Sequence, residues 1–514
     1  MKNKKYFFAV SFGTKVCIVI FLMLMIKTGL VYLESSSGEE DSCLAEALQS
    51  KNLQNENQAA QNEDRKESGT GDQEKYKEEN GRLSLVRKQS GEEPEVCVLI
   101  TNADGGRTHK LMQFSASESF SVTSEAGTDM FSAGEKVDPA VYFAEKGINS
   151  CCVSLCDDSG EIFGASETEG EASVEGIRVL SLKKGGNVPV YPGTLLIYRS
   201  SGQKAFYLIN RVRMESYLPG VVSSEMPDDF REEAIKAQAV CARSYAMYVL
   251  EKEKKETAEN GAVSWNLVDT TDDQVYLSGP VDLCAVTACR QTQGQILCRD
   301  EVPLKPHYYS TSWGIKADGS VFDGKETQYL EAAAAVKVDS DVTEMNRNFI
   351  STYESLSDRD TGENRAYDCK SPWFRWTCEI PLKQLSDRKI KELTVTKRGT
   401  GGYVSELTIS YADKTAQQIR GAGSVRRELG FSENVYRLQD NSTRTGLSIL
   451  PSAFFYMDEV KSTDGVQTVT LHGGGFGHGF GMSQYGAAQM AEEGYMYAEI
   501  LAYYYEKAEL EQVY

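Results

Sequence analysis

The chain has 514 residues and a formal net charge of −20, with a sequence pI near 4.9. This acidic balance argues against nucleic acid and anionic lipid head groups as primary partners, because both reward patches of Lys and Arg. A neutral or amidated glycan is compatible with it, and the length allows two to four domains.

The first 33 residues predict a membrane segment. Lys2, Lys4 and Lys5 precede an apolar stretch whose uninterrupted core is Val16–Ile26. A cleaved signal peptide has the same layout, but no A-x-A cleavage site follows, which favours a single-pass anchor of residues 1–33 in the cell membrane. Positive charge before the segment predicts a cytoplasmic N-terminus and an extracytoplasmic remainder.

Two regions of different composition follow the anchor. Residues 34–93 are rich in Glu, Gln, Asn, Ser and Lys, which predicts an acidic disordered spacer, because so few apolar groups cannot offset ordering entropy. Residues 94–190 alternate apolar runs with Gly, Asn and Asp turns, which predicts a small β-rich accessory module. Its expected strands are Val96–Thr101, Phe120–Thr123, Val141–Phe143, Asn149–Val153 and Ile177–Leu182.

Residues 191–514 mix strand and helix patterns in no βαβ order, which predicts an α+β domain. The expected strands are Leu195–Tyr198, Ala205–Val212, Gln295–Cys298, His307–Thr311, Glu392–Lys397, Ser405–Tyr411 and Gln467–Leu471. Two closing helices are expected at about Ser483–Glu493 and Ala498–Lys507.

An earlier helix is predicted by start signals, because Asp229 with Glu232 three residues later fits a capping box. Its apolar stripe consists of Phe230, Ala234, Ala237, Cys241, Tyr245 and Tyr248. Lys236 and Arg243 are spaced to share one helix face. Gln238 lies off that face, which favours a structural role.

Glu225 precedes this helix. Pro227 biases Met226 away from helical conformation, so we expect Glu225 on extended chain that runs into the helix. A nearby helix N-terminus would lower the pKa of Glu225 and burial would raise it, and a general acid needs burial to dominate. On spacing alone, a solvated residue or a cap is the simpler interpretation.

A glycine-rich loop lies far downstream, with six glycines in Gly473–Gly481. Glycine lets the backbone approach a ligand closely, so one interpretation is a sugar-binding wall. Its hydrogen-bonding side chains would be His478, Ser483, Gln484 and Tyr485. The other is a tight connection into the last helices, with Ser483 as N-cap. The two are compatible. Neither a Gly-Lys-Ser/Thr phosphate loop nor a nucleophile elbow is present here.

Two motifs resemble the signatures of the stage II sporulation protein D / LytB (amidase enhancer) family. The first, within Ser224–Leu250, is E-M-P followed by E-A-I-K-A-Q-A-V-x-A-R-S-Y, and the second, downstream, is G-F-G-H-G-F-G-M-S-Q-Y-G-A. Further similar segments are Asp269–Tyr276, Thr292–Leu297, Tyr309–Gly314, Trp373–Trp376 and Ile419–Gly430. The resemblance covers roughly residues 190–507.

The resemblance implies a peptidoglycan lytic transglycosylase, which cleaves the β-1,4 bond between MurNAc and GlcNAc and leaves a 1,6-anhydro sugar. It implies Glu225 as the acid/base and Lys236 and Arg243 as substrate ligands. One carboxyl suffices, unlike in glycoside hydrolases. The alternative is a non-catalytic, LytB-like enhancer or tether of a cell-wall amidase. Expected partners are glycan strands, with an amidase or other sporulation proteins.

No cofactor or metal is expected. The resemblance implies that some relatives carry a zinc site of Cys and His ligands just before the segment that matches Asp269–Tyr276. In this chain, Gly261–Asp269 offers neither residue type. Trp313 also departs from the glycine usual in the family's S-T-S-G-G run, which leaves the detail of that part of the site open.

Overall fold

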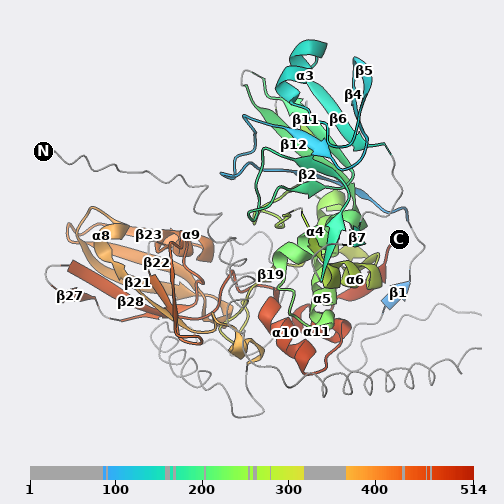
Figure 1. Ribbon diagram of the computed structural model, residues 1–514. Coiled ribbons are helices and arrows are strands. Elements are labelled where there is room, and N and C mark those ends of the chain that lie inside the picture. The colour runs from blue at the N-terminus through green and yellow to red at the C-terminus, as the bar shows by residue number, and fades with distance from the viewer. Residues whose placement is uncertain are drawn as a thin grey trace, which may run out of the picture. The chain divides into compact units, whose positions relative to one another are not determined.

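The computed structural model describes residues 85–87, 91–156, 163–165, 170–201, 204–252, 255–258, 263–277, 279–317, 366–430, 434–458, 460–463 and 466–514 (Figure 1). The expected anchor, residues 1–33, and nearly all of the expected spacer lie outside these ranges. Among the described residues, no helix is both long and apolar enough to cross a membrane.

The described residues combine helices with several separate sheets, so the α+β class is confirmed. The helices are α3 (Pro139–Lys146), α4 (Met214–Glu225), α5 (Glu232–Lys252), α6 (Leu283–Gln291), α8 (Leu382–Leu385), α9 (Ala422–Glu428), α10 (Gln484–Glu492) and α11 (Tyr497–Tyr504). Short 3-10 turns are η3 (Tyr367–Lys370) and η4 (Thr400–Gly402).

A seven-stranded sheet, in the order β15-β2-β12-β11-β6-β4-β5, dominates the first half of the described chain. Its strands are β2 (Glu95–Leu99), β4 (Phe120–Ser124), β5 (Gly127–Phe131), β6 (Ser150–Leu155), β11 (Thr194–Arg199), β12 (Phe206–Arg213) and β15 (Leu267–Val268). Strands from both sides of residue 190 hydrogen-bond in it, so the boundary expected there runs through one continuous sheet. One hydrophobic core joins this sheet to α4 and α5.

The expected strand Val141–Phe143 is wrong, because these residues lie in α3. The Asp138 side chain accepts from the Ala140 N–H at 2.8 Å as N-cap, and Pro139 opens the helix. Gly147 ends it in the left-handed conformation, with φ 69°. This Asp-Pro start and Gly stop are helix signals, and they outweigh the β-branched and aromatic residues between them.

Several smaller sheets are also present among the described residues. One contains β1 (Leu85–Arg87), β30 (Glu509–Gln512), β17 (Gln295–Arg299) and β18 (Val302–Pro303). Another contains β3 (Phe114–Ala116), β9 (Ile177–Val179) and β10 (Val190–Tyr191). Others pair β7 (Phe163–Ala165), β8 (Glu171–Val174) and β16 (Val281–Asp282), or β13 (Glu256–Ala258) and β14 (Val263–Trp265).

Helix α4 corrects the expected setting of Glu225. Glu225 is the last residue of this helix rather than part of an extended approach to the next. Met226, at φ −117° and ψ 139°, is extended as Pro227 predicts. Helix α5 begins only at Glu232, and Asp229 lies in the turn before it, so the expected capping box does not form.

Helix α5 is buried on nearly every side, not along one stripe, because α4, α6, α10, α11 and β17 all pack against it (Figure 1). The small residues of the A-x-A-V-x-A-R-S-Y run allow this close packing. The helix thus brings the two distant signature segments together, since α10 carries the end of the downstream one.

The second half of the described chain forms a core of its own around two sheets. The larger contains β25 (Ser442–Thr445), β24 (Asn434–Arg437), β20 (Trp376–Pro381), β28 (Val466–Gly473) and β26 (Phe455–Met457) in that order, with β27 (Lys461–Thr463) beside β28. The smaller contains β21 (Ile390–Arg398), β22 (Val404–Tyr411) and β23 (Ala416–Arg420). The short strand β19 (Tyr308–Tyr309) pairs in parallel with β29 (Met482–Ser483).

Candidate active site

The end of helix α4 is held by the segment that follows Asp269. The Val275 N–H donates to Glu225 Oε1 at 2.8 Å. The Leu277 N–H donates to Ser224 Oγ at 3.0 Å, and the Ser224 hydroxyl donates to the Gly220 carbonyl at 2.5 Å. These bonds hold the Glu225 carboxyl and the neighbouring Ser224 side chain in place.

The Glu225 carboxyl is enclosed but not sealed, because the residue keeps an intermediate exposure. Burial raises its pKa from 4.5 to about 7, against the Val275 N–H and the Tyr308 hydroxyl, whose hydrogen bonds lower it. No Lys, Arg or His of the described residues forms an ion pair with it. Near neutral pH, Glu225 therefore populates both its acid and its base form, as a proton-transfer group requires.

Tyr308 and Gln274 extend the hydrogen-bonding around Glu225. The Gln274 Nε2 donates to the Tyr308 hydroxyl oxygen at 3.1 Å. The Tyr217 hydroxyl donates to Gln274 Oε1 at 3.3 Å. Because the amide already donates to Tyr308, the Tyr308 proton is left for Glu225. Sequence reasoning missed all three residues, although Gln274 lies inside one family-like segment and Tyr308 directly precedes another.

The glycine-rich loop packs tightly against the β19 segment. A Cβ at Gly481, where φ is 85°, would lie 1.9 Å from the His307 carbonyl oxygen. A Cβ at Gly477, where φ is 115°, would lie 2.7 Å from the Tyr309 Cβ. Both positions thus require glycine for conformation and for space. Of the two interpretations of the loop, this supports a tight connection into the last helices.

His478 extends from this loop to Tyr308. Its Nε2 lies 3.0 Å from the Tyr308 carbonyl oxygen, and its Nδ1 accepts from the Phe480 N–H at 3.2 Å. These partners define a neutral ring with the proton on Nε2. Burial, with the neighbouring His307 and Arg426, lowers the pKa of His478 to about 3. His478 is therefore a neutral side chain that supports Tyr308, not a base.

Gln484 directly links the downstream signature to the candidate acid. Its Nε2 donates to the Glu225 carbonyl at 3.0 Å and lies 3.5 Å from Gln238 Oε1. Gln238 is fully buried, in keeping with the structural role expected for it. Gln484 thus positions Glu225 through its backbone.

Ser483 and Tyr485 flank Gln484 with different surroundings. Ser483 is buried, caps α10 by accepting from the Gly486 N–H at 3.1 Å, and donates to Asp368 Oδ1. The expected N-cap is confirmed, and this hydroxyl is engaged within the protein. Tyr485 keeps partial exposure, and its ring meets Phe230 edge to face with 5.2 Å between centroids.

Lys236 is engaged by acids of its own helix. Its Nζ lies 2.8 Å from Glu233 Oε1 and 2.9 Å from Glu232 Oε1. Burial acts to lower the pKa of Lys236, but the hydrogen bonds to Glu233 and Glu232 outweigh it and raise the pKa. Its expected contact with substrate would have to compete with these two carboxylates.

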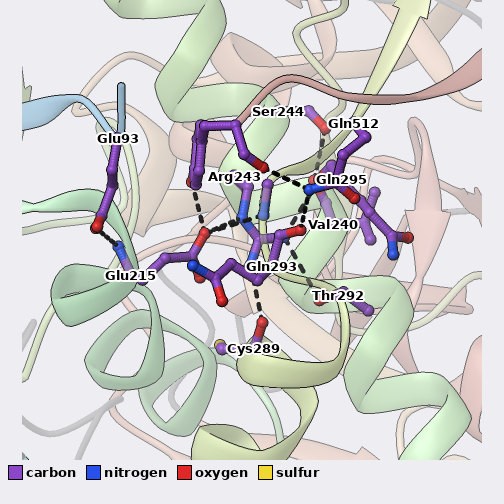
Figure 2. A network of polar contacts seen from close by, with 12 residues as sticks. Glu93, Glu215, Val240, Arg243, Ser244, Cys289, Thr292, Gln293, Gln295 and Gln512 are labelled. Atoms are coloured by element: carbon purple, nitrogen blue, oxygen red, sulfur yellow. Dashed lines mark hydrogen bonds and ion pairs between the residues drawn. The ribbon is translucent and has the colours of Figure 1, made fainter. Parts of the chain in front are cut away.

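Arg243 lies in the interior with no exposed side-chain surface. Its Nε and Nη2 donate to the two carboxylate oxygens of Glu215 at 2.7 and 2.8 Å (Figure 2). Its Nη1 and Nη2 also donate, at 3.2 Å each, to the carbonyls of Gln295 and Cys289. Burial acts to lower the pKa of Arg243, but Glu215 holds it above its ordinary value. This burial argues against the expected role in substrate binding.

Trp313, the departure from the family run, is a core residue. It is fully buried, its indole N–H donates to the Gly401 carbonyl at 2.9 Å, and it stacks on Phe454 with 3.8 Å between centroids. The large ring thus anchors the second half of the chain instead of lining the site.

Comparisons with known proteins match the part of the chain that carries Glu225. The family model described as "Stage II sporulation protein" matches residues 202–298, and a domain of unknown function matches residues 317–481. Stage II sporulation protein D of Bacillus subtilis (strain 168) is 25% identical over 336 residues, which cover 62% of this chain and 80% of the relative. The protein of the same name from Bacillus amyloliquefaciens is 26% identical over 337 residues, 62% of this chain and 79% of the relative.

A third relative is the amidase enhancer of Bacillus subtilis (strain 168), 27% identical over 299 residues, which cover 56% of this chain and 39% of the relative. The stage II sporulation protein model therefore matches the segment that carries Glu225, and the chain is similar to stage II sporulation protein D and amidase enhancer relatives over more than half of its length.

Proposed function

We propose that this protein is a peptidoglycan lytic transglycosylase that cleaves the MurNAc–GlcNAc β-1,4 bond and forms 1,6-anhydro-MurNAc. The observation that carries the proposal is the Glu225 carboxyl, which is enclosed, forms no ion pair with the described residues and has a pKa of about 7 where the two signature segments meet. Enclosing a carboxylate without a counter-charge costs stability, and carboxyls with such a raised pKa occur preferentially at functional sites.

One carboxyl accounts for the whole reaction. Protonated Glu225 donates its proton to the glycosidic oxygen as the bond from C1 to that oxygen breaks. The Glu225 carboxylate then takes the proton of the muramyl C6 hydroxyl, whose oxygen attacks C1 and closes the anhydro ring. Glu225 ends protonated, and no water is consumed.

The contacts of Glu225 support both halves of this cycle. Burial favours the protonated form that starts the reaction. The Val275 N–H and the Tyr308 hydroxyl stabilise the carboxylate that forms after the first transfer. A pKa near the working pH keeps both proton transfers accessible.

The proposal includes a cellular setting. Residues 1–33 would anchor the chain in the cell membrane with the N-terminus inside, and the site would face peptidoglycan outside, during cell-wall remodelling in sporulation. The names of the Bacillus relatives support a role in sporulation and a link to cell-wall amidases.

Product analysis tests the reaction. The detergent-solubilised full chain is incubated with purified peptidoglycan, and the muropeptides are analysed by mass spectrometry. Muropeptides with anhydro-MurNAc ends, lighter by one water than reducing ends, support the proposal. Reducing ends alone would indicate a hydrolase. No cleavage, with faster turnover by an added cell-wall amidase, would indicate the enhancer instead.

A further inference from the structure

One tryptophan of this chain differs from the others in exposure. The sequence has four, and Trp265, Trp313 and Trp376 are at most 1% exposed. Trp373 alone keeps an intermediate exposure. Trp373 packs partly against the core of the second half of the described chain, and the exposed remainder of its ring is a candidate contact for a ligand.

Trp373 is rigidly held against the glycine-rich loop. Its carbonyl accepts from the Gly475 N–H at 2.9 Å, and its ring lies 4.7 Å, between centroids, from that of Phe476. Phe476 is also partly exposed. The pair therefore forms a fixed aromatic surface on the loop that carries His478.

A charged pair borders this surface. The Arg437 guanidinium carbon lies 5.1 Å from the centre of the Trp373 ring. Arg437 forms an ion pair with Asp440 and donates to Ser442 Oγ. The two charges compensate each other, so the patch favours an uncharged ligand with polar groups over an acidic or a basic peptide.

A second aromatic pair, Phe230 and Tyr485, lies near the first, because the Tyr485 N–H donates to the Ser310 carbonyl at 3.0 Å and the Phe476 N–H donates to the adjacent Thr311 carbonyl at 2.8 Å. The pKa of Tyr485 is raised by burial and by Asp229 and Asp440, while Arg437 lowers it. Both rings are partly exposed. Phe230 closely follows Glu225 in the chain, and Tyr485 follows Gln484, which donates to the Glu225 carbonyl. The two pairs together, Phe230, Tyr485, Trp373 and Phe476, are here called the aromatic strip.

We propose that the aromatic strip is a glycan-binding subsite that holds amino-sugar residues next to the scissile bond. The apolar C–H face of a pyranose packs on aromatic rings, and the Asp440 carboxylate, whose side chain is 35% exposed, offers an acceptor to its hydroxyl and N-acetyl groups. The inference rests on the proposed function, since Glu225 defines the bond beside the strip. A polymer substrate needs contacts beyond the bond that is cut.

Tryptophan fluorescence tests the subsite without relying on catalysis. The full chain carrying Glu225→Gln is titrated with an oligomer of β-1,4-linked GlcNAc. We expect saturable change in tryptophan emission, since Trp373 is the exposed indole, and Trp373→Phe should remove most of that change. In calorimetry, Trp373→Leu should weaken binding roughly fivefold to thirtyfold, as the loss of a central aromatic contact does.

Tyr436→Ala is the matched control, because Tyr436 precedes Arg437 on β24 and is 40% exposed. This variant should bind the GlcNAc oligomer with the same affinity as the chain that carries Glu225→Gln alone. If Trp373→Leu does not fold, as judged by circular dichroism, Tyr485→Leu gives the same test from the other pair. Parent-like affinity in the folded variants would overturn the subsite.

The failure of the subsite and the failure of the reaction are distinguishable. If the wild-type chain releases anhydro-muropeptides but the strip variants bind and cut normally, the subsite is refuted and the reaction stands. If the wild-type chain cuts nothing but the strip variants lose GlcNAc-oligomer binding, the subsite stands and the reaction is refuted.

Discussion

Helix α4 carries a glutamate near each end, and their surroundings are opposite. Near the start, Glu215 accepts two hydrogen bonds from Arg243, one from the Gly294 N–H at 3.2 Å and one from the Tyr514 hydroxyl at 2.5 Å. At the end, Glu225 has one backbone N–H and one tyrosine hydroxyl, and no cation among the described residues.

The difference separates a charge with a structural role from the one that we propose takes part in chemistry. The Glu215–Arg243 pair joins α4 to α5, and its two charges compensate each other (Figure 2). The Tyr514 hydroxyl donates to the same carboxylate. Removing one partner of such a pair is strongly destabilising, because the other charge is left uncompensated. Glu225 lacks this compensation, so its proton is easily exchanged near neutral pH. Both residues lie in the family-model match, and the contacts, not the sequence position, assign their roles.

The largest predicted effect on stability concerns the compensated pair. Arg243→Ala should lower the free energy of unfolding by about 3–5 kcal/mol, because it empties a fully buried position and leaves the partly buried Glu215 without its cation. Lys236→Ala, which removes ion pairs to partly exposed acids on the same helix, should cost only about 0.3–1 kcal/mol. Urea denaturation measures both. A stable Arg243→Ala protein that no longer binds glycan would restore the substrate role for Arg243.

Glu225→Gln should have the opposite effect on stability above neutral pH. A carboxyl whose pKa rises from 4.5 to about 7 on folding contributes stability that is complete below pH 4.5 and is lost as the pH passes 7. Glutamine removes that loss. The variant should therefore exceed the wild type by on the order of 1–3 kcal/mol at pH 8, with the gain shrinking toward pH 5. Thermal melts across this range measure it, and a pH-independent difference would contradict the raised pKa.

Tyr308→Phe should shift the pH dependence of activity. The Tyr308 hydroxyl lowers the pKa of Glu225, so its removal should raise that pKa further. The fall in rate as Glu225 deprotonates should then move to higher pH, by on the order of one pH unit. Tyr276→Phe is the control, because that hydroxyl donates to Asn210 instead. Equal pH profiles for both variants would exclude Tyr308 from the proton-transfer group.

The smallest expected effect is that of chelation. The residues Gly261–Asp269 offer no Cys or His, and the described residues hold no group of three or more metal-binding side chains. Activity should therefore be unchanged by EDTA. Metal analysis should accompany the assay, and a stoichiometric zinc whose removal abolishes activity would refute this prediction.

The sequence predicted strands better than the helical half of the site. Period-two runs such as Ser405–Tyr411 were placed within a residue or two, because alternation survives whatever packs on the sheet. Helix α4 was missed, since Pro219 and Gly220 interrupt its pattern, yet the helix is stabilised by burial in the core. This error placed Glu225 on extended chain.

The candidate site also shows that motifs identify some residues but not the contacts that only the tertiary structure creates. The motifs identified Glu225 and the loop, and the fold brings them together through Gln484. They could not separate Arg243 from a ligand-binding arginine, because its partner Glu215 lies 28 residues earlier, and Tyr514, which donates to Glu215, lies 299 residues after Glu215. Tyr308 and Gln274 carried no spacing signal, since only the tertiary structure places them beside the acid.

The central claim is that Glu225 is the single proton-transfer group of this protein, and one rate ratio tests it most directly. Release of anhydro-muropeptides from purified peptidoglycan is measured for the wild type and for Glu225→Gln at equal folded concentration. Glutamine keeps the size and hydrogen bonding of Glu225 but cannot transfer the proton, so we predict a loss of at least about 10²–10⁴-fold. Near-normal release by the folded variant would contradict the assignment.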